Sequence, residues 1–208
     1  MLIDELKNIA RNNGIVGAGG AGFPAYAKMT EKADTVILNC VECEPLLKLH
    51  RQLLATHTEE IIQMLDEVRE SFGAKEAVIG IKSEYVTTIK AIEEVIGDFP
   101  NVRICALKAA YPMGDEVVLI YEATGRVIKP GGLPIDENVV VYNVETMYNL
   151  YRAVHLNIPV TNKLVSIVGE IDHPLTVRVP LGTTVKEAIS LAGKITVEDP
   201  AYVMGGPM

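Results

Sequence analysis

The sequence predicts an α/β protein: a Rossmann-like parallel sheet with helices on both faces, followed by a small β-grasp domain. Two observations carry this prediction. Short apolar runs alternate with longer segments of helical periodicity between residues 35 and 152, which is the pattern of βαβ units. Beyond residue 160 the pattern changes to two neighbouring strands and one capped helix. We therefore expect residues 1–160 to form the Rossmann-like domain and residues 161–208 the β-grasp domain.

The individual elements follow from periodicity and from helix-end signals. Apolar runs predict strands at residues 35–39, 77–81, 102–107 and 139–143. Helical spacing predicts helices at residues 2–12, 58–72, 84–96, 115–123 and 144–152. We expect Thr58 to cap its helix and Gly73 to end it. In the second domain we expect a hairpin over residues 163–180, a helix over 183–193 and a further strand.

Composition excludes several classes of protein. A net charge of −8 argues against a nucleic-acid surface, because phosphate neutralisation requires clustered Lys and Arg. The acidic start Met1–Glu5 does not resemble a signal peptide, and no apolar run has the length of a membrane span. We expect a cytoplasmic protein with no direct membrane insertion.

The cysteines are three in number, at positions 40, 43 and 105, so a disulfide framework is not expected. Cys40 and Cys43 form a C-x-x-C pair, but one pair and Cys105 fall short of the four thiolates of an iron–sulfur cluster or structural zinc. We expect no metal ligand in this chain. The pair either has a metal-binding or redox role, which is the less favoured interpretation, or supplies small buried side chains beside a site.

The most informative stretch runs from Gly14 to Lys28 and contains five glycines between Gly14 and Gly22. A segment so rich in residues without Cβ can place backbone N–H groups against an anion. Pro24 suits the first turn of a helix, whose positive end and Lys28 would add to the attraction. The stretch predicts a site for a phosphate-bearing cofactor; a flexible loop is the alternative.

The glycines at 17, 19 and 22 also satisfy the dinucleotide pattern G-x-G-x-x-G. That pattern has weight only after a strand, whereas residues 2–12 are expected to be helical. An ordinary Rossmann NAD dehydrogenase is therefore disfavoured. Polar residues at later strand ends allow two interpretations: Asp115 and Glu116 either complement a helix dipole or act in a site, and Asn143 either binds a ligand or caps a helix.

Four motifs appear in the order and spacing of a known family: the glycine stretch with Lys28, Asn39-Cys-Val-Glu-Cys-Glu-Pro45, Tyr111-Pro-Met-Gly-Asp-Glu116 and Asn143-Val-Glu-Thr146. They resemble the FMN- and NADH-binding subunit of respiratory complex I. The resemblance is closer to the Rnf complex C subunit, the cobalamin reductase of propanediol utilisation and the Rnf-C-like carrier of proline reductase. From Lys163 onward the chain resembles the soluble-ligand-binding β-grasp domain that follows in these proteins.

The resemblance implies FMN across the sheet, with its phosphate on the glycine loop. The cofactor contacts that it implies are Gly17, Gly19, Gly20, Gly22, Lys28, Asn39, Glu42, Tyr111, Gly114, Asp115, Asn143 and Thr146. A nicotinamide nucleotide would stack near Phe23, with Glu44 and Glu116 facing its sugars. No residue is expected to act as a general acid or base, because hydride transfer is the chemistry of the cofactor.

The chain departs from complex I at two places: Val41 stands where complex I has Asp, and Met29-Thr-Glu-Lys32 replaces aromatic residues. Relatives also carry a cysteine-rich segment for iron–sulfur clusters beyond the β-grasp domain. This chain stops at Met208 without one, so we expect a truncated chain whose 4Fe–4S clusters belong to the missing part.

The function that the resemblance implies is FMN-dependent electron transfer, from NADH to iron–sulfur clusters of an oxidoreductase complex. Its partners would be other subunits of that complex, and these would provide any association with a membrane or a microcompartment. The alternative is a non-catalytic module that docks a partner or binds a small ligand.

Overall fold

The computed structural model describes residues 1–20 and 22–205. The chain divides into two compact units. The first unit holds residues 1–43 and 50–159, and the second holds residues 44–49 together with the chain from residue 160 onward. The two units are described separately below.

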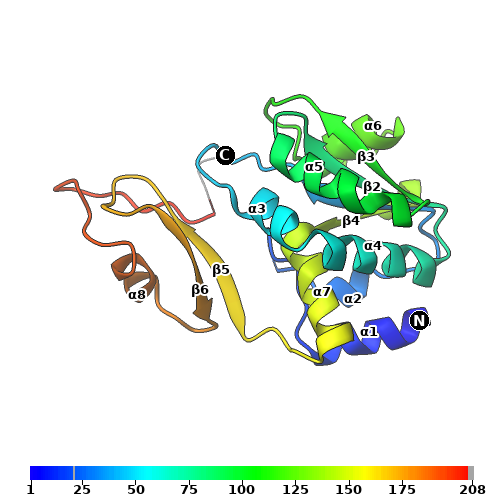
Figure 1. The fold of residues 1–208 in the computed structure, drawn as a ribbon, viewed down its shortest axis with the longest axis horizontal. Helices are drawn as coiled ribbons and strands as arrows, with labels where there is room; N and C mark the ends of the chain where they lie inside the picture. Colours follow the sequence, from blue (N-terminus) through cyan, green and yellow to red (C-terminus); the bar gives the residue numbers. More distant parts are fainter. Residues whose placement is uncertain (21, 206–208) are drawn as a thin grey trace. The chain divides into compact units, whose positions relative to one another are not determined.

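A four-stranded sheet forms the centre of the first unit (Figure 1). Its strands are β1 (Thr35–Cys40), β2 (Glu76–Lys82), β3 (Val102–Leu107) and β4 (Val139–Asn143). They lie in the order β3-β2-β1-β4, and every neighbouring pair is parallel. The predicted α/β fold with a Rossmann-like parallel sheet is therefore confirmed.

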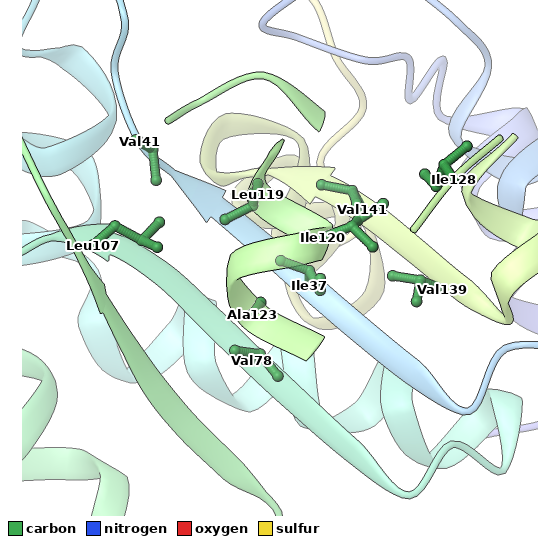
Figure 2. Packing of buried hydrophobic residues seen from close by; sticks show 10 residues of the cluster. All are labelled: Ile37, Val41, Val78, Leu107, Leu119, Ile120, Ala123, Ile128, Val139 and Val141. Atoms are coloured by element: carbon green, nitrogen blue, oxygen red, sulfur yellow. The ribbon is translucent and has the colours of Figure 1, made fainter. Parts of the chain in front are cut away.

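Helices cover both faces of this sheet. Helix α6 (Glu116–Thr124) packs on one face, where its Leu119, Ile120 and Ala123 meet apolar side chains of the strands (Figure 2). Helices α4 (Thr58–Phe72) and α7 (Val144–Leu156) pack on the opposite face and against each other. The strands are apolar on both faces because both faces are buried.

The remaining elements of the first unit surround this core. They are α1 (Ile3–Asn12), α2 (Ala25–Lys28), α3 (Leu49–Thr56), α5 (Val86–Val95) and the 3-10 helices η1 (Ile96–Asp98) and η2 (Pro134–Glu137). Helix α3 was not predicted. Thr58 is the first residue of α4 and not its cap, because α3 ends just before it and the Thr58 hydroxyl donates to the Leu54 carbonyl of α3 at 2.7 Å. Gly73 ends α4 in the left-handed conformation, as predicted.

The second unit contains a hairpin and one helix. Strands β5 (Asn162–Ile167) and β6 (Leu175–Pro180) pair antiparallel, and α8 (Val185–Ser190) follows. Thr184 and Glu187 cap α8 reciprocally. Where the sequence predicts a further strand, the described part of the chain has a single bridge between Ile171 and Ile195.

Among the described residues, no helix has both the length and the apolar composition needed to cross a bilayer.

Candidate functional site

The carboxyl ends of β1 and β4 bring two asparagines together. Asn39 near the end of β1 lies directly opposite Asn143 on β4, because the two residues are partners in the parallel register. The chain leaves β1 for β2 on one side, whereas β4 joins β1 from the other side. The β1/β4 edge is therefore a topological switch point, where open α/β sheets bind their ligands.

The glycine stretch forms a closed loop above this edge. Val16 bridges Pro24, and the Gly17 N–H donates to the Phe23 carbonyl at 2.8 Å, so the two ends of the loop are held together. The Ala18 N–H donates to Thr146 Oγ1 at 2.9 Å, which ties the loop to the first turn of α7. These contacts tie the two ends of the loop to each other and Ala18 to α7.

A cavity of about 310 Å³ lies between this loop and the sheet edge. Most of the residues predicted for the site line it: Gly17, Gly19, Gly20, Gly22, Phe23, Lys28, Asn39, Glu116, Asn143 and Thr146. The other described residues of the lining are Ala25, Val141 and Tyr142, and the sequence did not indicate them. The cavity volume is at the lower end of the range for small-molecule sites.

Some predicted site residues have other surroundings and do not line the cavity. Asp115 is the N-cap of α6, and its Oδ1 accepts from the N–H groups of Val117 and Val118 at 3.0 and 3.2 Å. Tyr111 is exposed, and Glu44 belongs to the segment 44–49 of the second unit.

Gly114 and Glu42 also lie outside the cavity lining. The Gly114 carbonyl accepts from Asn39 Nδ2 at 3.0 Å, and its N–H donates to Cys43 Sγ at 3.2 Å. A Cβ at Gly114 would collide with the Val41 carbonyl, so only glycine fits there. The Glu42 side chain is buried, and its Oε2 lies 3.0 Å from Nδ1 of His50.

Lys28 supplies the positive charge of the cavity lining. Its Nζ lies 3.3 Å from Glu116 Oε1 and donates to the Val141 carbonyl at 3.4 Å. Phe23 lies beside the same ammonium group, with the ring centroid 5.9 Å from Nζ. The Lys28 ammonium group therefore lies near both the Glu116 carboxylate and the Phe23 ring.

The helix dipole at this cavity comes from a different helix than the sequence predicted. Helix α2 has only four residues, and Pro24 is its N-cap, so it has almost no macrodipole. The thirteen-residue helix α7 instead begins at the cavity, since its N-cap Asn143 and its first-turn Thr146 both line it. The positive end of α7 adds to the charge of Lys28.

The arrangement fits a phosphate-bearing cofactor. Within residues 1–20 and 22–205, the N–H groups of Gly19 and Gly20 donate to no protein acceptor. A Cβ at Gly19 would lie 2.6 Å from Asn143 Nδ2, so the backbone can approach the sheet edge this closely only as glycine. Available amides beside Lys28 and a helix N-terminus are what a phosphate requires.

The three cysteines differ in burial and in their contacts. Cys40 is fully buried on β1, and burial raises the pKa of its thiol above the usual range, which suppresses thiolate chemistry. Cys43 accepts the hydrogen bond from Gly114, and all three cysteines are free thiols. In the described part of the chain, no three His, Cys, Asp or Glu residues are grouped so that they could hold a metal ion.

Two protein-family models match this chain. Residues 10–152 match the family model of the Nuo51 FMN-binding domain, and residues 164–208 match that of the SLBB domain. The chain belongs to the family of flavin-binding proteins related to complex I, as the four motifs indicated. It thus combines an FMN-binding domain with an SLBB domain, and the implied chemistry is flavin-based electron transfer.

Curated relatives share this organisation. The chain is 40% identical to the cobalamin reductase PduS of Salmonella typhimurium, over 99% of this chain and 45% of that protein. It is 32% identical to the C subunit of the Na(+)-translocating ferredoxin:NAD(+) oxidoreductase complex of Acetobacterium woodii, over 99% of this chain and 47% of that protein. The chain therefore spans about half the length of these relatives, which are oxidoreductases.

Solved structures support the fold. An NAD+-reducing NiFe hydrogenase in the H2-reduced state superposes with a TM-score of 0.76 at 22% identity, over 91% of this chain and 39% of the hydrogenase chain. The air-oxidized state gives a TM-score of 0.77 at 23% identity, over the same shares of the two chains.

Proposed function

We propose that this chain is the flavin-binding part of an electron-transfer protein that accepts electrons from NADH and passes them to iron–sulfur clusters. The cavity at the β1/β4 edge carries the proposal, because it combines available amides, the Lys28 ammonium and the start of α7 in one place. The phosphate of FMN would occupy the end of the cavity near Gly19, Gly20 and Lys28.

FMN supplies acceptance of a hydride and release of single electrons, and the protein has only to bind and orient it. The glycine amides and Lys28 would hold the phosphate, and Asn39 and Asn143 would offer amide groups to the rest of the cofactor. Phe23 lines the cavity and is 53% exposed, and a nicotinamide ring would stack on its aromatic side chain. Glu116 would accept hydrogen bonds from the ribose hydroxyls of the nicotinamide nucleotide.

The names of the relatives support NADH, clusters and partner subunits as parts of this function. One relative belongs to a complex named as a ferredoxin:NAD(+) oxidoreductase, and the structural neighbours are NAD+-reducing hydrogenases. We propose that this chain works in a comparable assembly, and that 4Fe–4S clusters belong to parts outside these 208 residues. Free thiols at all three cysteines fit a reducing, cytoplasmic compartment.

Titration with FMN tests the proposal. We expect quenching of flavin fluorescence with one FMN per chain, and reduction of the bound flavin on addition of NADH. The substitution Gly19→Ala should weaken binding by about tenfold or more, because the new Cβ would meet Asn143 Nδ2 at 2.6 Å. Gly97→Ala is the matched control, since a Cβ at Gly97 meets nothing within 4 Å.

A wild-type chain that does not quench flavin fluorescence, and that is colourless once free FMN is removed, would overturn the proposal. The SLBB match over residues 164–208 would then favour the alternative, a docking or ligand-binding module without a cofactor. In that case partner capture should be unaffected by Gly19→Ala. Equal FMN affinity in the Gly19 and Gly97 variants would instead show that the glycine loop does not contact FMN.

A further inference from the structure

We propose that His50 is a positioning residue of this site: packed against Glu42, it fixes the side-chain amide of Asn143 against the glycine loop. The inference rests on the proposed function, because its consequence is a change in FMN affinity. His50 belongs to α3, the helix that the sequence did not predict, and it is absent from the motifs that indicated the family.

The contact between His50 and Asn143 involves the nitrogen of the amide. Asn143 Nδ2 lies 3.2 Å from Nε2 and 3.4 Å from Nδ1 of the imidazole. The other end of the same amide, Oδ1, accepts the Glu145 N–H at 2.9 Å. Because a backbone N–H requires an acceptor, this hydrogen bond fixes which end of the amide is oxygen. His50 then occupies the side where the NH2 group must lie.

The His50 imidazole also contacts the buried side chain of Glu42. Its Nδ1 lies 3.0 Å from Glu42 Oε2, and the side chains are only 14% and 9% exposed. Among the described residues Glu42 Oε2 has no aligned hydrogen-bond donor, so the carboxylate restrains the imidazole by close packing and proximity and not by a hydrogen bond. Glu42 follows directly on Val41, whose N–H donates to Asn39 Oδ1 at 3.0 Å. The pair is thus anchored to the end of β1.

The glycine loop, the Asn143 amide and the His50 imidazole are in close contact at the edge of the cavity. An ideal Cβ at Gly19 would lie 2.6 Å from Asn143 Nδ2 and 3.5 Å from His50 Cε1. The amide is therefore enclosed between the glycine loop and the imidazole. Asn143 also lines the cavity and caps α7, so an amide free to rotate would change both the wall of the site and the helix start.

Removal of His50 should loosen this wall without touching the cavity lining itself, since His50 is not among the lining residues. Partners that orient ligating groups in metal sites typically contribute about 10–100-fold in affinity. We expect a loss of about tenfold in FMN affinity for His50→Ala. His50→Gln should recover most of it, because the Gln side chain can accept from Asn143 Nδ2 and donate to Glu42.

Two measurements on the full chain test the proposal. The first is the dissociation constant of FMN for wild type, His50→Ala and His50→Gln. The second is the side-chain NH2 resonance of Asn143 in ligand-free, nitrogen-15-labelled protein, which should shift and lose protection from exchange in His50→Ala. The matched control is His155→Ala, since His155 Nε2 forms a similar pair with Glu67 Oε2 at 3.0 Å outside the cavity lining.

The outcomes separate this inference from the proposed function. If wild type binds no FMN, the proposed function fails, and the Asn143 resonance still decides on the His50 contact. Unchanged affinity and an unchanged resonance in His50→Ala would overturn the inference. It would also be overturned if His50→Gln behaved like His50→Ala while both variants kept wild-type melting temperatures. If His50→Ala does not fold, the comparison of His50→Gln with wild type decides in the same way.

Discussion

Lys28 and Glu116 are 88 residues apart in the sequence and form an ion pair in the wall of the cavity, with Nζ 3.3 Å from Oε1. Lys28 ends the single turn of α2, and Glu116 begins α6. The two side chains are 36% and 41% exposed, so water screens their attraction. A phosphate dianion can therefore compete for the ammonium group at little cost.

Lys28→Met should discriminate between flavins with and without a phosphate. A hydrogen bond to a charged group contributes about 2 kcal/mol, which corresponds to about 30-fold in affinity. We expect that loss for FMN, and little change for riboflavin. Fluorescence titration measures both, and Lys32→Met, at an exposed position, is the control. A parallel loss for riboflavin would contradict the assignment of Lys28 to the phosphate.

Asp115→Ala should lower stability and leave FMN affinity nearly unchanged. The Asp115 carboxylate caps α6 and does not line the cavity, and loss of such a cap costs about 1 kcal/mol. Urea unfolding measures the change, and Asp115→Ser should preserve most of the stability. A large loss of FMN affinity with stability intact would show instead that Asp115 contacts the flavin, as the family resemblance implies.

Gly80→Ala should destabilise the sheet. A Cβ at Gly80 on β2 would come within 2.5 Å of Leu119 Cδ1, which packs from α6 (Figure 2). Overpacking of this kind typically costs about 1–3 kcal/mol. Thermal unfolding against Gly97→Ala isolates the packing effect, because both changes add one methyl group. Similar melting temperatures in the two variants would mean that Leu119 moves aside freely.

The stability of the first unit should fall at acidic pH through Asp34. Hydrogen bonds from the Arg126 guanidinium hold the pKa of the Asp34 carboxyl below its usual value. A lowered folded-state pKa means that the stabilisation is present above the unfolded-state pKa, near 4, and is lost as pH falls through the folded-state value. The stability difference between wild type and Asp34→Asn should therefore shrink from pH 7 to pH 3. A constant difference in urea unfolding would refute the linkage.

Much of the fold could be predicted because its signals are local. The apolar runs of β1 and β4 have the length and composition of buried strands, and Gly73 has the conformational freedom that the end of α4 requires. Helix α3 was missed because its eight residues carry no recognisable cap. The start of α4 was misassigned by one residue because the Thr58 hydroxyl bonds back to α3.

Local signals could not decide between two roles for the same polar residue. Asp115 followed by Glu116 is compatible with stabilising a helix dipole or with binding a ligand, and only the structure shows that Asp115 caps α6 while Glu116 lines the cavity. Asn143 does both, since its oxygen caps α7 and the residue lines the cavity. His50 gave no signal because a single histidine in the short helix α3 has no motif around it.

The sequence by itself determined the α/β class, the glycine loop and the family, because periodicity and ordered motifs are properties of neighbouring residues. The tertiary structure decided which of those residues meet. Strand order places Asn39 opposite Asn143, and packing of the loop brings Lys28 to Glu116 and Ala18 to Thr146. Such contacts depend on the register of strands and helices far apart in the chain, which only the folded sheet fixes.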